Sequence, residues 1–312
     1  MLQLNFVLQK KRKYDILFLI KDVILLGVKI NPKKEGRRIK TLPPISRVSP
    51  YIMKRRNDAA NGLSDTLDIA KADEYIFKKR EQGLKGFGML HVFLAGYTRV
   101  ISQRPAVNRY IRGQKVYSRN CIEIMITIKK EMTIESPDTV LKLIIPADAT
   151  SDVVYEILTD AIEKSRASDS EFDDTAKFFN YIPGLFLKFT VWLLNIFDYF
   201  NLIPRSLTKI SPFHGSFAIT SMGSLGIPPV YHHLYDFGNI PVFIAFGAKY
   251  TKNVLELDGT VVQRKYIDYK ITSDERICDG HYFASALKLF KAIMKNPECL
   301  DNPPETVIED IP

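Results

Sequence analysis

The chain has 312 residues, of which 46 % are hydrophobic and 25 % are charged. These values allow one large domain or two small ones with a full core, and they exclude disordered and fibrous classes of protein. Three widely spaced cysteines without a CxxC pair exclude a disulfide-stapled domain and a cysteine-bound metal. We therefore expect no metal, a reducing compartment such as the cytoplasm, and free thiols at Cys121, Cys278 and Cys299.

Basic residues are concentrated near the N-terminus, and the net charge of the whole chain is +9. Residues 1–60 contain 15 Lys and Arg against 4 Asp and Glu, so the rest of the chain is nearly neutral. We expect residues 1–44 to form a basic arm or strap, which is either solvated or directed at an anionic partner such as a membrane surface. The apolar stretch 14–30 is interrupted by charges and predicts an amphipathic element rather than a spanning helix. The arm lacks the aromatic interleaving of a nucleic-acid-binding segment, so no specific nucleic acid is expected.

Periodicity and turn residues predict most of the remaining elements. Four prolines in residues 31–50 favour an extended strap. Helical patterns cover residues 64–82, 87–103, 151–168 and 281–297. Extended patterns cover hairpins at 107–118 and 256–274, strands at 121–128, 139–146 and 241–250, and a strand entering a loop at 215–227. The Asp258-Gly259 pair in the second hairpin is a strong turn signal.

The most apolar segment of the chain is IPGLFLKFTVWLLNIFDYFNLIP, residues 182–204. On a helix, Lys188, Asn195 and Asp198 fall on one narrow face. Two interpretations remain open: a helix that protein covers on most sides, or a helix that contacts a membrane surface or another subunit. Its charged residues argue against a membrane-spanning helix.

Three stretches carry a resemblance to a known family. They are GSFAITSMGSLGI (215–227), PVFIAFGAKY (241–250) and DGTVVQRKYIDYKITSDERICDGHYFASALKLFKAIMKNPECL (258–300). They resemble the catalytic domain of the dihydrolipoamide acyltransferases of 2-oxoacid dehydrogenase complexes, and the related chloramphenicol acetyltransferases. The resemblance covers residues 45–300 and leaves 301–312 as a C-terminal tail.

The resemblance implies an α/β fold, a two-layer sandwich with a mixed β-sheet, as in coenzyme-A-dependent acyltransferases. It also implies a homotrimer with each site between subunits, and transfer of an acyl group between coenzyme A, or another carrier thiol, and an unknown acceptor. No lipoyl domain is expected before this domain. The family places a histidine in a His-x-x-x-Asp-Gly pattern, and here that position is Glu275, followed by Asp279 and Gly280.

The resemblance suggests roles for several residues. Glu275 is a base if its surroundings make it one, a non-catalytic residue in a retired site, or a position aligned wrongly. Asp279 is expected mainly to hold the turn through an ion pair with Arg55 or Arg56. Thr220, in FAIT, is either a donor to the oxyanion or an ordinary strand residue.

The adjacent residues His232 and His233 stand in the loop PPVYHHLYDFG, residues 228–238. Either of them supplies the missing imidazole, or both are packing and surface residues. The sequence therefore predicts an acyltransferase with a non-standard base. The alternative is a non-catalytic homologue that acts as a binding or assembly subunit, peripheral to a membrane.

Overall fold

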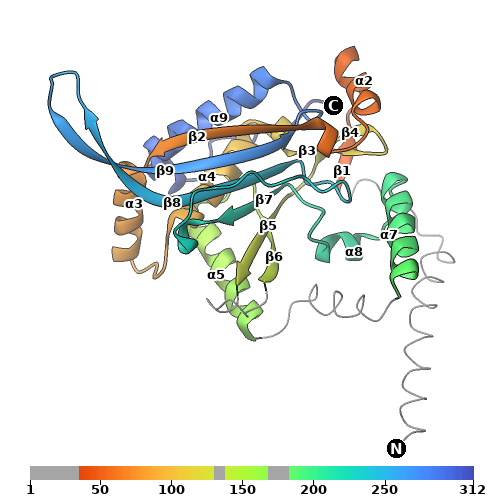
Figure 1. Ribbon diagram of the computed structural model, residues 1–312, viewed down its shortest axis with the longest axis horizontal. Coiled ribbons are helices and arrows are strands. Elements are labelled where there is room, and N and C mark those ends of the chain that lie inside the picture. Colours follow the sequence, from red (N-terminus) through yellow and green to blue (C-terminus); the bar gives the residue numbers. More distant parts are fainter. Residues whose placement is uncertain (1–34, 130–137, 168–182) are drawn as a thin grey trace, which may run out of the picture.

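The computed structural model describes residues 35–129, 138–167 and 183–312 (Figure 1). The amphipathic element predicted at 14–30 lies outside these residues. A mixed six-stranded sheet runs through the domain, because the β5–β7 and β7–β8 pairs are parallel and the other pairs are antiparallel. In spatial order its strands are β2 (Ala60–Asp68), β9 (Val261–Asp274), β8 (Val242–Leu255), β7 (Phe217–Ser221), β5 (Ile122–Lys129) and β6 (Asp138–Ile145).

Helices cover one face of this sheet and form the second layer. They are α3 (Ala70–Glu81), α4 (Met89–Gln103), α5 (Ser151–Ala167) and α9 (Gly280–Lys295). Helix α4 is buried along nearly its whole length, and its Phe93 stacks on Phe246 of β8 with ring centroids 4.4 Å apart. Because one main core lies between helices and sheet, the predicted two-layer α/β sandwich with a mixed sheet is confirmed.

The helix predicted over residues 64–82 is wrong in its first part. Residues 60–68 form the edge strand β2, whose nine residues all pair with β9, and the helix begins only at Ala70. The misleading pattern came from Leu67, which is buried as a strand residue in the main core. Pairing with residues about 200 positions further along the chain therefore decides the local structure.

A second, three-stranded sheet holds the start of the described chain. Its order is β1 (Gly36–Arg38), β4 (Lys115–Arg119) and β3 (Arg109–Arg112), and β3 and β4 form the hairpin predicted at 107–118. The expectation of an extended strap over residues 31–50 is wrong in its last part, because residues 44–50 belong to helix α2 (Pro44–Ile52). This helix has proline in its first turn, where no amide donor is needed. The last residues run back onto the domain, because Ile308 N donates to Ser102 O and Asp310 pairs with Arg109 at 2.5 Å.

The remaining described elements are helices outside the main helical layer and short turns. They are α7 (Gly184–Tyr199), α8 (Arg205–Ile210) and the short 3-10 turns Asn57–Ala59, Pro105–Asn108, Gly223–Leu225 and Pro297–Leu300. Strands β8 and β9 continue past the sheet as a long hairpin that extends away from the domain (Figure 1). Its turn contains Asp258 and Gly259, and Gly259 has φ +85°, as the Asp-Gly signal predicted.

A buried polar network ties the second sheet to the rest of the domain. The Glu35 carboxylate accepts hydrogen bonds from Arg112 (2.6 Å), Arg119 (2.9 Å) and Asn239 (2.8 Å). Burial by itself raises the pKa of Glu35, but the charges of Arg119 and Arg112 outweigh it and hold this pKa well below its usual range. The carboxylate therefore stays ionised and stabilises two buried guanidinium groups.

Replacing this carboxylate tests the network through pH. Because the folded pKa of Glu35 is lowered, its contribution to stability is complete above the unfolded pKa of about 4.3 and is lost as the pH falls below it. We expect Glu35→Gln to lower the free energy of unfolding by about 2–3 kcal/mol at neutral pH. Urea titrations at neutral pH and at pH values below the unfolded pKa should also show that the free energy of unfolding depends less on pH in the variant. If the free energy of unfolding changes with pH equally in the two proteins, the prediction is wrong.

Candidate functional site

Glu275, the residue at the expected histidine position, lies immediately after β9 and is exposed. Its backbone N–H donates to Ala59 O, and its carboxylate accepts a hydrogen bond of 2.6 Å from Asn61 Nδ2. The Glu275 side chain is thus hydrogen-bonded to a residue of the edge strand β2 at the surface of the protein. This environment does not enclose Glu275.

Asp279 has a structural role at the start of α9. Its carboxylate accepts a hydrogen bond of 2.8 Å from Tyr282 N and so caps the helix. The expected ion pair with Arg55 or Arg56 is not what the described residues form. Arg55 pairs instead with Asp58 at 3.0 Å on the surface, and Arg56 lies beside Asp274 at 3.7 Å.

Asp274 is the centre of a buried ion cluster. Arg276 binds it through two nitrogens, Nε at 2.8 Å and Nη2 at 2.7 Å, and Arg56 Nε lies 3.7 Å from its Oδ2 atom. Arg56 also donates to the carbonyls of Tyr235 and Gly238, both at 2.5 Å, and so connects the end of β9 to the histidine loop. No local pattern in the sequence predicted this cluster, although Asp274 and Arg276 flank Glu275 directly.

The loop that carries the two histidines crosses the second face of the large sheet. Pro229 packs on Gly247, and the Tyr231 ring lies 3.0 Å from where a Cβ on Gly62 would stand, so the glycine allows this close approach. The Lys270 Nζ lies 4.7 Å from the centre of the Tyr231 ring. The loop therefore forms a cover over β2, β9 and β8.

His232 is the histidine that this cover turns toward the sheet. Its ring stacks on Phe243 of β8, with centroids 4.2 Å apart and planes 15° from parallel. Its Nε2 atom is buried and has no hydrogen-bond partner among the described residues. Burial, and then the neighbouring His233, lower the pKa of His232, so the ring is neutral near pH 7. His233 is exposed, and its ring meets that of Tyr235 edge-on, at 4.9 Å between centroids.

Thr220 lies on the same face of the sheet as His232. In the same strand, Phe217 and Ile219 point into the main core. Because side chains alternate along a strand, Ala218 and Thr220 point to the second face of the sheet. Ala218 pairs with Phe243, the residue under the His232 ring, and Thr220 is two positions further along β7, or about 7 Å. The structure thus places the imidazole of His232 and the hydroxyl of Thr220 on the same face of the sheet, over neighbouring strands.

Two further groups belong to this surface and were not predicted. Thr220 of β7 pairs with Ala245 of β8, which in turn pairs with Lys270 of β9. Lys270 has no carboxylate partner among the described residues. Thr272 pairs with Phe243, and its buried Oγ1 lacks a hydrogen-bond partner within the same part of the chain. Glu275 is five residues beyond Lys270, about 16 Å along β9. Within one chain, Glu275 and Thr220 are therefore not brought together.

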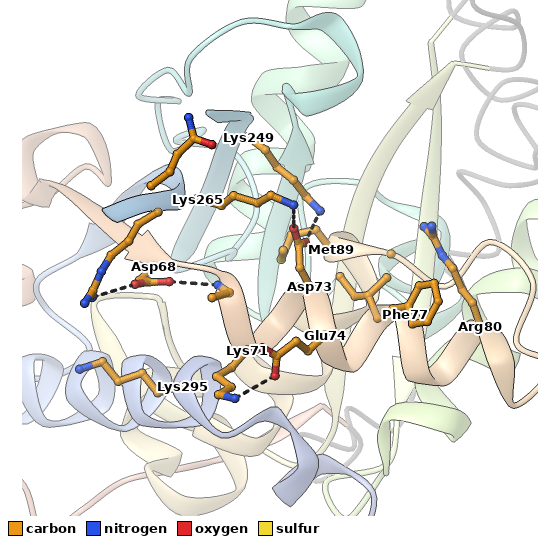
Figure 2. A pocket seen from close by; sticks show the side chains of 15 residues that line it. Asp68, Lys71, Asp73, Glu74, Phe77, Arg80, Met89, Lys249, Lys265 and Lys295 are labelled. Carbon is orange, nitrogen blue, oxygen red and sulfur yellow. Dashed lines mark hydrogen bonds and ion pairs between the residues drawn. The ribbon is translucent and has the colours of Figure 1, made fainter. Parts of the chain in front are cut away.

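A separate cleft of about 900 Å³ opens beneath the β8–β9 hairpin, beside α3 (Figure 2). Its three carboxylates all form ion pairs: Asp68 with Arg264 at 3.4 Å, Glu74 with Lys71 at 2.8 Å, and Asp73 with Lys249. None of the predicted catalytic residues lines this cleft. Among the described residues, no three His, Cys, Asp or Glu side chains gather into a metal-binding group.

The comparisons with known proteins concern the fold. No protein-family model matches the chain, and no curated protein matches it in sequence. A probable dihydrolipoamide acetyltransferase from Listeria monocytogenes is 14 % identical, with a TM-score of 0.54 over 82 % of this chain and 95 % of that one. The cubic core of a pyruvate dehydrogenase multienzyme complex is 13 % identical, with a TM-score of 0.53 over 84 % of this chain and 93 % of that one.

A chloramphenicol acetyltransferase structure, 11 % identical, covers 83 % of this chain and 99 % of its own with a TM-score of 0.48. At such low sequence identities, structural similarity shows a shared fold, and any function has to be argued from the residues of the site. The chain has the fold of the catalytic cores of dihydrolipoamide acetyltransferases.

Proposed function

We propose that the protein is an acyltransferase that moves an acyl group between coenzyme A, or another carrier thiol, and an acceptor, with His232 rather than Glu275 as the base. One observation carries this proposal. The neutral ring of His232 lies flat on Phe243 with an enclosed, unbonded Nε2, on the same face of the sheet as the Thr220 hydroxyl. Glu275 is exposed and hydrogen-bonded to Asn61, so it is the weaker candidate.

The proposed chemistry assigns the proton transfers to His232 and the stabilisation of the oxyanion to Thr220. His232 accepts the proton of the attacking thiol or hydroxyl, and the resulting nucleophile adds to the acyl carbonyl. The Thr220 hydroxyl donates a hydrogen bond to the oxygen that becomes negative. When the tetrahedral intermediate collapses, the acyl group stays on the acceptor and His232 returns its proton to the departing thiolate.

Two features of the surface suit a carrier thiol such as coenzyme A. The unpartnered Nε2 of His232 and Oγ1 of Thr272 are enclosed polar atoms, which call for a hydrogen-bonding ligand or water. Lys270 supplies a cation on the same face for an anionic part of the donor. We also propose a homotrimer in which a second copy completes the site, because Thr220 and Glu275, which the resemblance places in one site, lie apart within one chain.

Calorimetric titration with acetyl-coenzyme A and with free coenzyme A tests this proposal directly. Saturable binding at micromolar ligand is expected, and Lys270→Ala should weaken it, whereas Lys252→Ala, on the outer hairpin, should not. Sedimentation of the protein alone should give the mass of a trimer. If neither ligand binds at millimolar concentration, the coenzyme-A reading fails and a non-catalytic assembly subunit becomes the better description.

A further inference from the structure

Helix α7 is attached to the domain through its C-terminal end. Asp198 is the buried residue of this helix, and its carboxylate lies 3.1 Å from Arg112 Nε and 3.4 Å from His214 Nε2. The hydroxyl of the adjacent residue, Tyr199, donates to Gln114 Oε1 at 2.9 Å. Arg112 also donates to Asn201 Oδ1 at 2.6 Å. These contacts fix which side of α7 faces the protein.

The opposite side of α7 is apolar and exposed. Phe189 is nine residues before Asp198, about two and a half turns, and so points away from the domain. Leu185, Phe189 and Trp192 follow the i, i+4, i+7 spacing of one stripe and are 84 %, 57 % and 55 % exposed. A surface helix normally turns such a stripe toward the core. The interpretation of a helix covered by protein on most sides is therefore wrong for the described residues.

Helix α2 repeats this arrangement. Ile45, Val48 and Ile52 share one side of the helix and are 73 %, 49 % and 70 % exposed. Both helices stand at the right-hand end of the molecule in Figure 1, opposite the β8–β9 hairpin. We call the exposed apolar residues of α2 and α7 the paired stripes.

Basic residues border the paired stripes. Lys188 on α7, and Arg47, Lys54 and Arg55 on or just after α2, are all exposed. Two copies meeting through these faces would oppose like charges, which disfavours a self-contact. Apolar and aromatic side chains bordered by cations are instead typical of helices that lie in the interface of an anionic bilayer. Among the described residues, no helix is both long and apolar enough to cross a bilayer.

We propose that the paired stripes dock the protein on the surface of a membrane that contains anionic lipids, with α7 lying in the headgroup region. This inference does not rest on the proposed chemistry. The chain carries its own reporter, because Trp192 is its single tryptophan and belongs to the α7 stripe.

The test mixes the full-length protein with vesicles of phosphatidylcholine, with and without phosphatidylglycerol. We expect co-sedimentation and a blue shift of Trp192 emission with the anionic vesicles, both reduced by salt. Phe189→Ser should weaken vesicle binding about ten- to a hundredfold, because an aromatic side chain no longer leaves water. Leu257→Ser removes an apolar residue that is even more exposed than Phe189, at the tip of the hairpin, and should leave binding unchanged.

Three results would overturn the proposal. The first is no Trp192 shift with either kind of vesicle. The second is a shift on concentrating the protein alone, together with a larger sedimenting species, because that would identify a self-contact. The third is equal weakening by Phe189→Ser and Leu257→Ser, which would mean that vesicle binding does not depend on the stripes.

Discussion

His232→Gln is expected to lower kcat/KM for acyl transfer by ~10²–10⁴-fold, the usual contribution of a positioned general base. Glutamine keeps the approximate size and polarity of the side chain over Phe243 but cannot accept and return a proton at neutral pH. Acetyl-coenzyme A with dihydrolipoamide as the acceptor is a suitable assay. The pH profile gives a second readout, because the pKa of His232 is lowered. Activity should therefore persist below the ordinary histidine range and fall at more acid pH, and the variant should lack this limb.

Matched variants distinguish three interpretations of the site: His232 as the base, Glu275 as the base, and a site without catalytic activity. Glu275→Gln removes the carboxylate at the position where the resembling family has histidine, and His233→Gln alters the exposed neighbour of His232. We expect both to retain most of the activity. If Glu275→Gln abolishes turnover while His232→Gln does not, the glutamate is the base and our assignment is wrong. If the unmodified protein shows no turnover, the non-catalytic alternative gains support.

Asp274→Ala is expected to lower the free energy of unfolding by about 3–5 kcal/mol, because it leaves Arg56 and Arg276 buried without a compensating charge. The two guanidinium groups then repel each other, and the contacts from Arg56 to Tyr235 and Gly238 lose their support. Since those contacts hold the histidine loop, acyl transfer should fall together with stability. Urea unfolding, followed by circular dichroism, measures the effect.

Asp58→Ala provides the control for this experiment. Asp58 forms an ion pair with Arg55 at 3.0 Å, but both side chains are exposed to solvent. Solvent screens such a surface pair, so it contributes little to stability and the variant should unfold at nearly the same urea concentration as the unmodified protein. Similar losses in both variants would mean that the buried cluster around Asp274 is not a major source of stability.

Elements with strong local signals were predictable from the sequence. Asp258-Gly259 specifies its hairpin because glycine accepts the positive φ of the turn. The helix at 87–103 follows from its apolar length and the proline after it, and α4 agrees within two residues. The prediction for residues 64–68 was wrong for the opposite reason. These residues form a strand because β9 pairs with them, and no local signal specifies it.

Most of the candidate site depended on contacts that no local pattern contains. The sequence marked His232, Thr220 and Glu275 as candidates but could not rank them. The ranking came from the ring of His232 on Phe243 and from the exposure of Glu275. The ion-pair partner of Arg56 was also predicted incorrectly, because Asp274 and Asp279 are close in sequence but face different surroundings.

The apolar segment around α7 illustrates the division most clearly. Its composition by itself determined that residues 184–199 form a helix rich in aromatic residues, with a few polar groups on one side. Only the tertiary structure decided which side meets solvent, because the ion pair between Asp198 and Arg112 joins residues 86 positions apart. A single buried carboxylate is costly unless a cation compensates it, so this pairing turns the side of the helix that carries Asp198 inward. The apolar stripe is left facing outward, and the sequence pattern alone would have placed it in the core.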